Sequence, residues 1–416
     1  MSIYYVSAQG CDTNDGLSKD SALKSVAKVN SLLESGDEVR FRAGDVFYGG
    51  LRPPRGISEN ERTTVTRYGE GKNPVISQYK KANVGAWELH SDDIYKIDLT
   101  NIENFTGNTQ NIDTRVGFIK ISGKIYHRLC KSLEELKNEF DFFCDDRYLY
   151  LKLFQSPDSY SDDFLFACNI KMIAPTDFLM IDSVDFCGTG GHGFQGVSSG
   201  SIIRNCAFCE IGGSFMLDAR GNPTTIRYGN GVEFWTGSHD NLVENCHFAD
   251  IYDVAMSIQG CDAVTNWENI VFRNNKTYNC TQSFEIWTKT EKEHNGIVNC
   301  YFENNTCINS GYGWGHLARP DKDQSCHLLI YHRECEYCDI HVKNNTFVNA
   351  KNSVIFKTGG AKDIPHDYKV YDNLFIHDMK KSLVFRMAGT NEKDYELYEK
   401  ELLKNNTFRN INDFQK

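Results

Sequence analysis

The chain has 416 residues, of which 40% are hydrophobic and 24% are charged, a composition typical of a folded globular protein with a large core. Its formal net charge of −11 and its pI near 5.6 argue against a nucleic-acid partner, whose phosphates the chain would repel. The first residues lack a basic stretch followed by a long apolar one, and no later stretch is apolar enough to cross a membrane. We therefore expect a cytoplasmic protein with no membrane partner, or a secreted one if a signal peptide precedes the given sequence.

The N-terminal region predicts a small set of elements in a fixed order. Residues 4–51 read as a strand, a glycine-rich turn, a short amphipathic helix at about 22–33 and a further strand in "GDEVRFRAGDVF". Short alternating strands then follow in "WELHSDDIYKIDL", "VGFIKISGKIYHRL" and "RYLYLKLF", around a small helix in "SLEELKNEF". We predict that residues 86–166 form an inserted β-rich module whose simplest role is to wall a cleft.

From residue 167 onward a corner containing asparagine recurs at intervals of roughly thirty to forty residues. The corners are "RNCAF" (204–208), "ENCHF" (244–248), "NNKTY" (274–278), "NNTC" (304–307), "NNTF" (344–347), "DNLF" (372–375) and "NNTF" (405–408). Between them lie short β-rich runs broken by polar turns, with little helical periodicity before a charged surface helix at 391–405. A strand repeat of this length predicts a coiled β-solenoid.

A second short strand follows most corners. These strands are "HGFQG" (192–196), "GVEFW" (231–235), "AMSIQ" (255–259), "SFEIW" (283–287), "SVIFK" (353–357) and "SLVFR" (382–386), where "GVEFW" belongs to the set if 211–228 is an inserted loop. With a side-chain period of two, the second and fourth residues face the core, namely Met256/Ile258, Phe284/Ile286, Val354/Phe356 and Leu383/Phe385. Two outward rows follow, one of Glu233, Ser257 and Glu285, and one of Trp235, Gln259, Trp287, Lys357 and Arg386.

The N-terminal stretch "YYVSAQGCDTNDGLSKDSALKSVAKVNSLLESGDEVRFRAGDVFYGGL" and the repeats together resemble the right-handed parallel β-helix proteins of the pectate-lyase-like superfamily. The resemblance implies an all-β, right-handed parallel β-helix whose open end is covered by the N-terminal helix. The expected organisation is a cap with the first coils over 1–85, the inserted module over 86–166, and the main β-helix over 167–416, with long loops at 211–228 and 317–338. The resemblance points to carbohydrate chemistry without naming one activity.

Glu233 and Glu285 are the candidate acid and base. If each coil advances about 4.8 Å, their backbones lie about 9 to 10 Å apart with Ser257 between them. Paired carboxylates about 6.5–9.5 Å apart suit inverting glycoside hydrolysis, whereas about 5 Å suits a retaining mechanism. Trp235 and Trp287 in the adjacent row would cover the apolar face of a sugar. The alternative interpretation is that both glutamates are merely solvated side chains on a strand face.

Further candidates lie in neighbouring turns and coils. Asp253 and Asp218 are the reserve catalytic acids, although aspartate is common in turns for backbone reasons alone. Six residues are predicted to contact substrate besides the tryptophans: Ser257, Gln259, His192, His239, His316 and Arg319. The segment 317–338 is long enough to overhang the groove that these residues would line.

The cysteines and the Asn-Asn-Thr tripeptides have simpler structural interpretations. Fifteen cysteines, an odd number scattered in strand-like runs, indicate reduced core residues rather than a disulfide framework. Cys335 and Cys338 have a CxxC spacing, but Cys326, His327 or His332 would have to complete a zinc site, so no metal is predicted. Asn304, Asn344 and Asn405 head formal glycosylation sequons, and we interpret them instead as members of an asparagine ladder at the corners.

The function most consistent with these features is glycoside hydrolysis of an oligosaccharide or polysaccharide, without a cofactor. A polysaccharide lyase is the alternative: it would use Lys357, Arg386 or Arg319 as a base beside a uronate carboxyl, often with Ca²⁺. A non-catalytic carbohydrate-binding solenoid is the third possibility, because it would explain the tryptophans without the acids. The sugar, its linkage, endo or exo action and the oligomeric state stay open.

Overall fold

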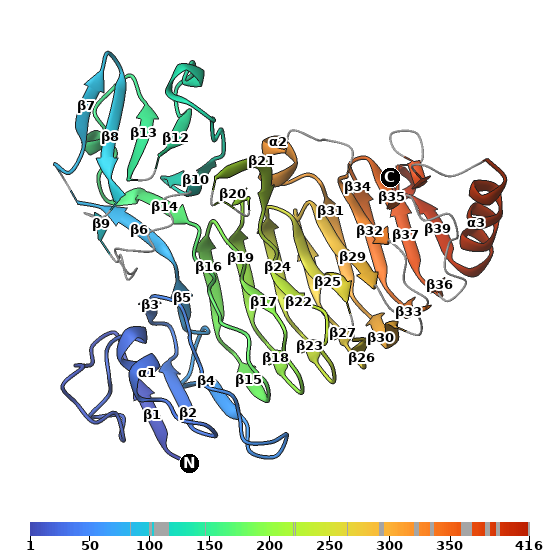
Figure 1. The fold of residues 1–416 in the computed structure, drawn as a ribbon, viewed down its shortest axis with the longest axis horizontal. Helices are drawn as coiled ribbons and strands as arrows, with labels where there is room; N and C mark the ends of the chain where they lie inside the picture. Colours follow the sequence, from blue (N-terminus) through green and yellow to red (C-terminus); the bar gives the residue numbers. More distant parts are fainter. Residues whose placement is uncertain are drawn as a thin grey trace.

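Three long parallel sheets form the body of the molecule and confirm the predicted right-handed parallel β-helix (Figure 1). This computed structural model describes residues 1–83, 85–99, 102–103, 116–145, 147–218, 220, 222–263, 265–290, 295–319, 324–332, 337–358, 368–378, 383–387 and 392–414. The chain visits the sheets in turn, so that each coil adds one strand to a sheet and pairs in parallel with the coil before it.

The first two sheets run nearly the whole length of the solenoid. Sheet 1 contains β1 (Ile3–Val6), β2 (Glu38–Arg42), β4 (Thr63–Tyr68), β15 (Leu179–Asp182), β18 (Ile202–Arg204), β23 (Leu242–Glu244), β27 (Val271–Arg273), β30 (Gly296–Glu303), β33 (Tyr337–Lys343) and β36 (Tyr368–Tyr371), with β26 (Trp267–Glu268) beside β30. Sheet 2 contains β3 (Val46–Tyr48), β5 (Val75–Ser77), β16 (Asp185–Thr189), β19 (Ala207–Ile211), β24 (His247–Ile251), β28 (Lys276–Tyr278), β31 (Thr306–Ser310), β34 (Thr346–Ala350), β37 (Leu374–His377) and β39 (Thr407–Asn410).

Sheet 3 carries the candidate site. Its strands, in spatial order, are β17 (Phe194–Gly196), β22 (Val232–Phe234), β25 (Val254–Ala263), β29 (Gln282–Thr290), β32 (Cys326–His332), β35 (Ser353–Thr358) and β38 (Leu383–Met387). One continuous apolar core fills the space between the three sheets. Phenylalanines stack inside it from coil to coil, as in Phe186, Phe208 and Phe248, whose neighbouring ring centroids are 5.1 and 5.3 Å apart. Thr277 and Cys307 interrupt the stack on the next two rungs, and it resumes with Phe347, Phe375 and Phe408. The repeated contact stabilises the coil-by-coil register.

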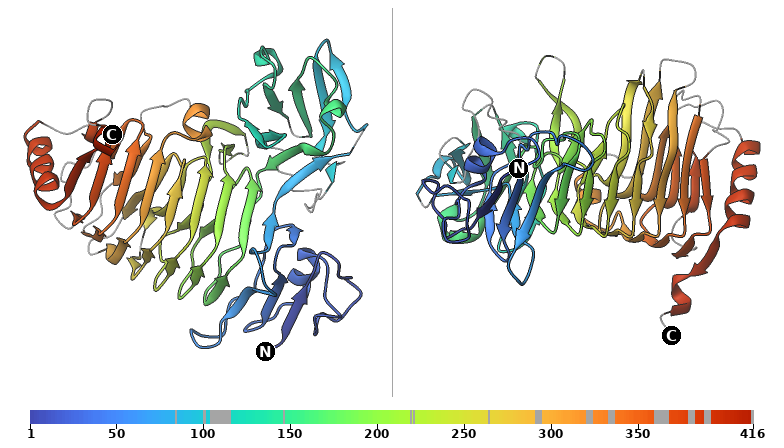
Figure 2. Two further views of the ribbon diagram at one scale, coloured as in Figure 1. Left: turned by 180° about the vertical axis from the view of Figure 1, so that it is seen from behind. Right: turned by 90° about the horizontal axis from the view of Figure 1, so that it is seen from below.

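Helices are few and lie at the ends or on the side of the solenoid (Figure 2). The expected N-terminal helix is present but shorter, as α1 (Val26–Leu32), with Ser25 accepting the N–H of Lys28 as its N-cap. Val26 and Val29 of α1 join the main core, as a capping role requires. The predicted C-terminal surface helix is α3 (Glu392–Asn405), and α2 (Trp314–Ala318) precedes β32. No helix of the described residues is long and apolar enough to span a membrane.

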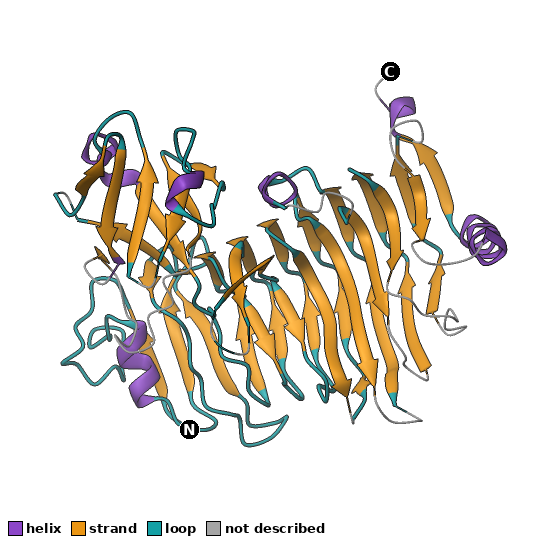
Figure 3. Ribbon diagram, turned by 45° about the horizontal axis from the view of Figure 1, so that its top comes forward, coloured by secondary structure: helices purple, strands orange, loops and turns teal. Residues whose placement is uncertain are grey.

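Residues between β5 and β15 form two antiparallel sheets beside the solenoid (Figure 3). One contains β6 (Tyr79–Ala82), β9 (Ile102–Glu103), β10 (Val116–Ile121), β11 (Lys124–Tyr126) and β14 (Phe164–Cys168), and the other β7 (Glu88–Ser91), β8 (Ile94–Asp98), β12 (Phe142–Cys144) and β13 (Tyr148–Lys152). They enclose an apolar cluster of their own. In place of the expected small helix there is a 3₁₀ turn at Leu133–Glu135, and two further 3₁₀ segments span Pro157–Asp163 and Ile411–Phe414.

Both of the expected long loops contain regular structure. The insertion at 211–228 is a hairpin of β20 (Ser214–Leu217) and β21 (Pro223–Tyr228). The segment 317–338 includes β32, a full strand of sheet 3 next to β29, so the expectation of one overhanging loop there was wrong. The physical reason is that α2 is inserted between β31 and β32 and breaks the spacing that identified the other strands.

The asparagine ladder exists, but it is built by the second asparagine of each pair. Buried Asn305, Asn345 and Asn373 hydrogen-bond from coil to coil, with Asn345 donating to Oδ1 of Asn373 at 2.9 Å. The first asparagines, Asn304 and Asn344, instead hold the left-handed turn conformation with φ of 57° and 56°. Asn405 ends α3. The prediction that the first asparagines form the ladder was therefore wrong by one residue.

We expect Asn345→Ala to lower the free energy of unfolding by about 3 kcal/mol, because it leaves several buried ladder groups without partners. Asn344→Gly is the matched control: its side chain is exposed and glycine adopts its backbone conformation freely, so we expect a change near zero. Urea unfolding of both variants measures the difference. Equal stabilities would show that the ladder contributes nothing.

No disulfide joins any of the cysteines that the structure describes. Cys335, half of the CxxC spacing, lies outside the described residues. Two groups considered for a zinc site are buried, Cys326 and His327, and Nδ1 of His327 lies 2.8 Å from the hydroxyl of Ser310. Within the described ranges, no group of three or more His, Cys, Asp or Glu is placed to hold a metal ion.

Candidate active site

Sheet 3 places Glu233 and Glu285 on one row that faces away from the main core. Glu233 on β22 pairs with Ser257 on β25, and Ser257 pairs with Glu285 on β29. The two glutamates are therefore two rungs apart, with backbones about 9 to 10 Å from each other. The whole row, in spatial order, is Gln195, Glu233, Ser257, Glu285, Leu329, Phe356 and Arg386.

The predicted register holds for β25 and β29 and fails at β35. Met256 and Ile258, like Phe284 and Ile286, lie in the main core as predicted. On β35 it is Ile355 that pairs with an inward residue, Leu328, so the expectation that Phe356 faces inward was wrong by one residue. Lys357 pairs with Ile330 rather than continuing the tryptophan row, and Arg386 joins the glutamate row. Arg386 stacks there on Phe356, with its guanidinium carbon 4.7 Å from the ring centroid.

Glu233 is buried, with only 1% of its surface exposed. Its Oε2 accepts a hydrogen bond from Nδ2 of Asn230 at 2.5 Å. Burial raises the pKa of Glu233 to about 7, although the hydrogen bonds from Asn230 and Gln195 and the charge of Lys171 act to lower it. A carboxyl with this pKa is poised near neutral pH, as a general acid or base requires.

Glu285 is also buried, with 8% of its surface exposed, and Nε2 of Gln259 donates to its Oε2 at 2.6 Å. Burial raises the pKa of Glu285 well above its ordinary value, and the negative charge of Asp253 adds to this effect. The positive charge of Arg319 opposes both. A raised pKa favours the protonated form of Glu285, which suits a proton donor.

Asp253 and Arg319 form an ion pair beside the two glutamates. Nη1 of Arg319 donates to Oδ1 of Asp253 at 2.5 Å, and their side chains are only 12% and 16% exposed. Asp253 directly precedes β25, the strand between the two that carry the glutamates, whereas Arg319 directly follows α2. The structure thus brings two of the predicted site residues together from segments far apart in the chain.

Trp235 and Trp287 lie next to each other, with ring centroids 6.2 Å apart and planes inclined by 38°. Both side chains are partly exposed, and each follows a site glutamate by two residues. Gln259 on the intervening strand pairs with Trp287 in the sheet register. This aromatic surface adjoins the carboxylates, an arrangement suited to binding the apolar face of a sugar ring.

His192 and Ser257 also belong to this cluster. Nδ1 of His192 accepts the backbone N–H of Asn230 at 3.1 Å and lies 3.6 Å from Oε2 of Glu233. Burial, and then the charge of Lys171, lower the pKa of His192 to about 3, so this contact joins a neutral ring to the carboxyl rather than an ion pair. Ser257 is buried between the two glutamates, with Oγ 3.5 Å from Nδ2 of Asn230.

Three of the predicted residues have other contacts. Asp218 lies in the turn of the β20–β21 hairpin, where its carboxylate accepts the backbone N–H groups of Arg220 and Asn222 at 2.8 Å each. His239 lies in an exposed corner with Nδ1 2.8 Å from Asp240. His316 on α2 is buried with Nδ1 2.6 Å from Oγ of Ser325. None of these described contacts involves Glu233 or Glu285.

Sequence reasoning missed three residues around Glu233. Gln195 and Asn230 hydrogen-bond its carboxyl, and Lys171 acts on it by charge while donating to the backbone oxygen of Gln195 at 2.7 Å. Gln195 could have been found, because it stands at the position of the strand "HGFQG" that matches Glu233. Lys171 gives no such signal, since it precedes the strands of its coil.

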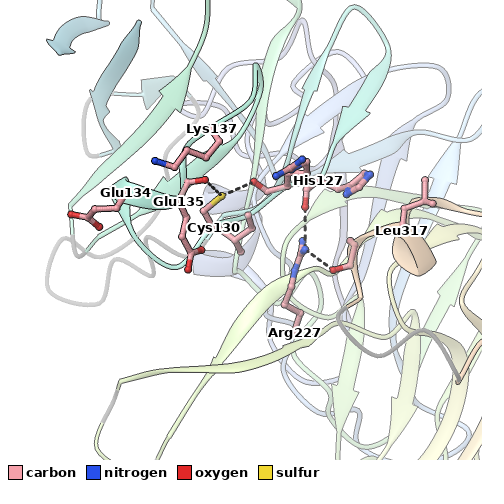
Figure 4. A pocket seen from close by; sticks show the side chains of 10 residues that line it. His127, Cys130, Glu134, Glu135, Lys137, Arg227 and Leu317 are labelled. Carbon is pink, nitrogen blue, oxygen red and sulfur yellow. Dashed lines mark hydrogen bonds between the residues drawn. The ribbon is translucent and has the colours of Figure 1, made fainter. Parts of the chain in front are cut away.

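The β-rich segment between β5 and β15 meets α2 around a cavity of about 520 Å³ (Figure 4). Arg227 lines this cavity, and its guanidinium donates to the backbone oxygens of Gly117, His127, Gly213 and Ala318. On α2, Trp314 contacts the rings of Phe118 and Tyr252 and donates to the backbone oxygen of Asp250. These contacts fix the position of α2, and hence of Arg319, against the solenoid.

Comparisons with known proteins identify the fold and no closer relationship. No protein-family model matches the chain, and no curated protein matches it. A structure of XylC in complex with xylose has a TM-score of 0.57 at 11% identity, covering 90% of this chain and 76% of that one. GH136 lacto-N-biosidase from Eubacterium ramulus has a TM-score of 0.40 at 11% identity (98% and 68% covered), and a rhamnogalacturonan lyase 0.42 at 12% (99% and 88%). The likeness to the XylC structure shows the β-helix fold and nothing finer.

Proposed function

We propose that the protein is a glycoside hydrolase that cleaves an oligosaccharide or polysaccharide with two carboxyl groups, by an inverting mechanism. The observation that carries the proposal is the pair Glu233 and Glu285, two rungs apart on one row, each buried and each with a raised pKa. Their backbones are about 9 to 10 Å apart, and flexible side chains can bring the carboxyl groups to the separation of about 6.5–9.5 Å at which a water molecule fits between an acid and a base.

The two carboxyl groups have different environments, which assign one of them as the acid and the other as the base. Glu285 keeps its proton, since burial and the charge of Asp253 both oppose its ionisation, and it protonates the leaving glycosidic oxygen. Glu233, with a pKa of about 7 and hydrogen bonds from Asn230 and Gln195, ionises more readily and removes a proton from the attacking water. The sugar ring on one side of the scissile bond lies against Trp235 and Trp287.

Two observations make the lyase alternative weaker. Arg319 is bound to Asp253, and Arg386 is stacked on Phe356, so neither guanidinium is placed as an independent base. Lys357 is buried at a position that pairs with a core residue of β32. The predicted lyase bases therefore lack the shared geometry that the two glutamates have.

Product analysis on neutral and uronate-containing oligosaccharides, with and without a chelator, tests the proposal. Hydrolysis produces new reducing ends without ultraviolet absorbance, and Glu233→Gln and Glu285→Gln should both lose them. An unsaturated, ultraviolet-absorbing uronate product would instead identify a lyase. Binding without any product would identify a non-catalytic solenoid.

We expect Trp287→Ala to raise KM about tenfold with a smaller change in kcat, because the ring contributes binding rather than proton transfer. Tyr278→Ala, which removes an exposed aromatic from sheet 2, is the matched control and should leave KM unchanged. Steady-state kinetics of both variants provide the measurement. An unchanged KM in Trp287→Ala would show that the tryptophan pair does not contribute to substrate binding.

A further inference from the structure

One face of the β20–β21 hairpin fixes it to neighbouring parts of the chain. Arg227 and Phe215 pair across the hairpin and are only 6% and 9% exposed. The guanidinium of Arg227 donates to the backbone oxygen of His127, in the segment between β5 and β15, and to that of Ala318 on α2 (Figure 4). The hairpin therefore has a defined position beside the solenoid.

The opposite face of the hairpin is apolar and exposed. Side chains alternate along a strand, so Ile226 and Met216 point away from the buried pair of Arg227 and Phe215. Ile226 is 58% exposed and Met216 is 42% exposed, and Leu217 beside Met216 is 41% exposed. Apolar side chains that gather on one exposed surface are typical of a binding site.

This apolar face continues into the candidate active site. Tyr228 follows Ile226 by two residues on the same face, and its ring centroid lies 4.9 Å from that of His192. Nδ1 of His192 in turn lies 3.6 Å from Oε2 of Glu233. The hairpin meets one end of β22 and Trp235 follows the other end, so Glu233 lies between two aromatic side chains along its strand.

The chemistry of the face favours an apolar occupant. Thr224, Ile226, Tyr228 and Met216 carry no charge, and Oγ1 of Thr224 already accepts the N–H of Ile226 at 3.1 Å. A sugar bound over Ile226 and Met216 would lose water from its hydroxyl groups without gaining hydrogen bonds from these side chains, which costs free energy. An alkyl or aryl group loses no hydrogen bonds there and gains from the burial of apolar surface.

We propose that the exposed face of the β20–β21 hairpin binds an apolar alkyl or aryl group that is attached to the glycan substrate. The inference rests on the proposed hydrolase function and narrows its substrate class to glycosides with an apolar aglycone. Ile226 and Met216 contact the aglycone and determine this specificity, whereas Trp235 and Trp287 contact the sugar.

The binding of methyl, phenyl and octyl glycosides of glucose, galactose and xylose tests the inference. Titration calorimetry is carried out on Glu233→Gln, so that no substrate is cleaved, with the octyl glycosides below the concentration at which they form micelles. For at least one of the sugars we expect the phenyl or the octyl glycoside to bind about tenfold more tightly than the methyl glycoside. The comparison of octyl with phenyl distinguishes a chain from a ring as the preferred group.

Two substitutions locate the binding of the aglycone. Ile226→Ser and Met216→Ser, each added to Glu233→Gln, should weaken binding of the preferred apolar glycoside about tenfold and leave binding of the methyl glycoside unchanged. Ile57→Ser is the matched control, because Ile57 is 59% exposed and lies in the loop before β4. Equal affinities for the three aglycones, or an equal loss in Ile57→Ser, would overturn the inference.

The remaining outcomes separate this inference from the proposed function. A wild-type dimer that dissociates in Ile226→Ser during sedimentation would show that a second copy of the chain covers this face, and would overturn the inference. Binding of the apolar glycosides through the hairpin without any cleavage by the wild type would refute the hydrolase function and leave the hairpin site standing. Cleavage of all three glycosides with equal KM would refute the hairpin site alone.

Discussion

Replacing Glu285 with glutamine is expected to reduce kcat/KM by about 10³-fold on a glycoside with a poor leaving group, because no proton reaches the departing oxygen. On an aryl glycoside whose phenol leaves without protonation, the same variant should retain most of its activity. Glu233→Gln removes the base and should lose about 10³-fold on both kinds of substrate. The ratio of the two rates in each variant assigns the acid and the base.

The pH dependence of activity follows from the ionisation of Glu233 and Glu285. Activity should fall as the pH drops below about 7, because Glu233 must be ionised and its pKa is about 7. It should also fall at higher pH, when Glu285 loses its proton, and this alkaline limb should be absent from Glu285→Gln. Glu244→Gln, remote from the row, is the control and should keep both limbs. If Glu285→Gln hydrolyses an aryl glycoside as poorly as it hydrolyses the natural substrate, this result would contradict the role of Glu285 as the acid.

The glutamate row could be predicted from the sequence because apolar and polar residues alternate around each site position. Ser257 stands between Met256 and Ile258, and Glu285 stands between Phe284 and Ile286, so their outward faces follow directly. The same rule fails in β35, where Val354, Ile355 and Phe356 are three apolar residues in succession. Without alternation the sequence does not distinguish two registers that differ by one residue, and the structure has the one that was not predicted.

The burial of the site could not be predicted, because it depends on residues distant in the chain. Glu233 is surrounded by Lys171 and Asn230, and Glu285 lies near Arg319, which follows a short helix inserted into its coil. A strand pattern gives the face of a side chain but not what packs over that face. The raised pKa values, which separate a solvated glutamate from a catalytic one, are therefore visible only in the folded structure.

The second prediction with a large effect concerns how Glu233 makes the free energy of unfolding depend on pH. The sign of this dependence follows from the direction of the pKa shift of Glu233. The pKa of Glu233 is about 7 when folded against an ordinary value of 4.5, so the folded protein binds a proton that the unfolded chain has lost between these pH values. Stability is therefore lost as the pH rises through this window. The shift lowers the free energy of unfolding by about 3 kcal/mol at pH 8 relative to pH 4.5.

Glu233→Gln should abolish this loss of stability at high pH, since glutamine has a similar shape and no charge. We expect equal stability of variant and wild type near pH 4.5, and a variant more stable by about 2 to 3 kcal/mol at pH 8. Urea unfolding at the two pH values measures the difference, with Glu244→Gln as a control in which an ion pair is lost instead. A stable but inactive Glu233→Gln would show that the buried carboxyl is retained for catalysis at the expense of stability. Equal destabilisation at both pH values would mean that Glu233 is already ionised in the folded protein, and the assignment of a poised base would fail.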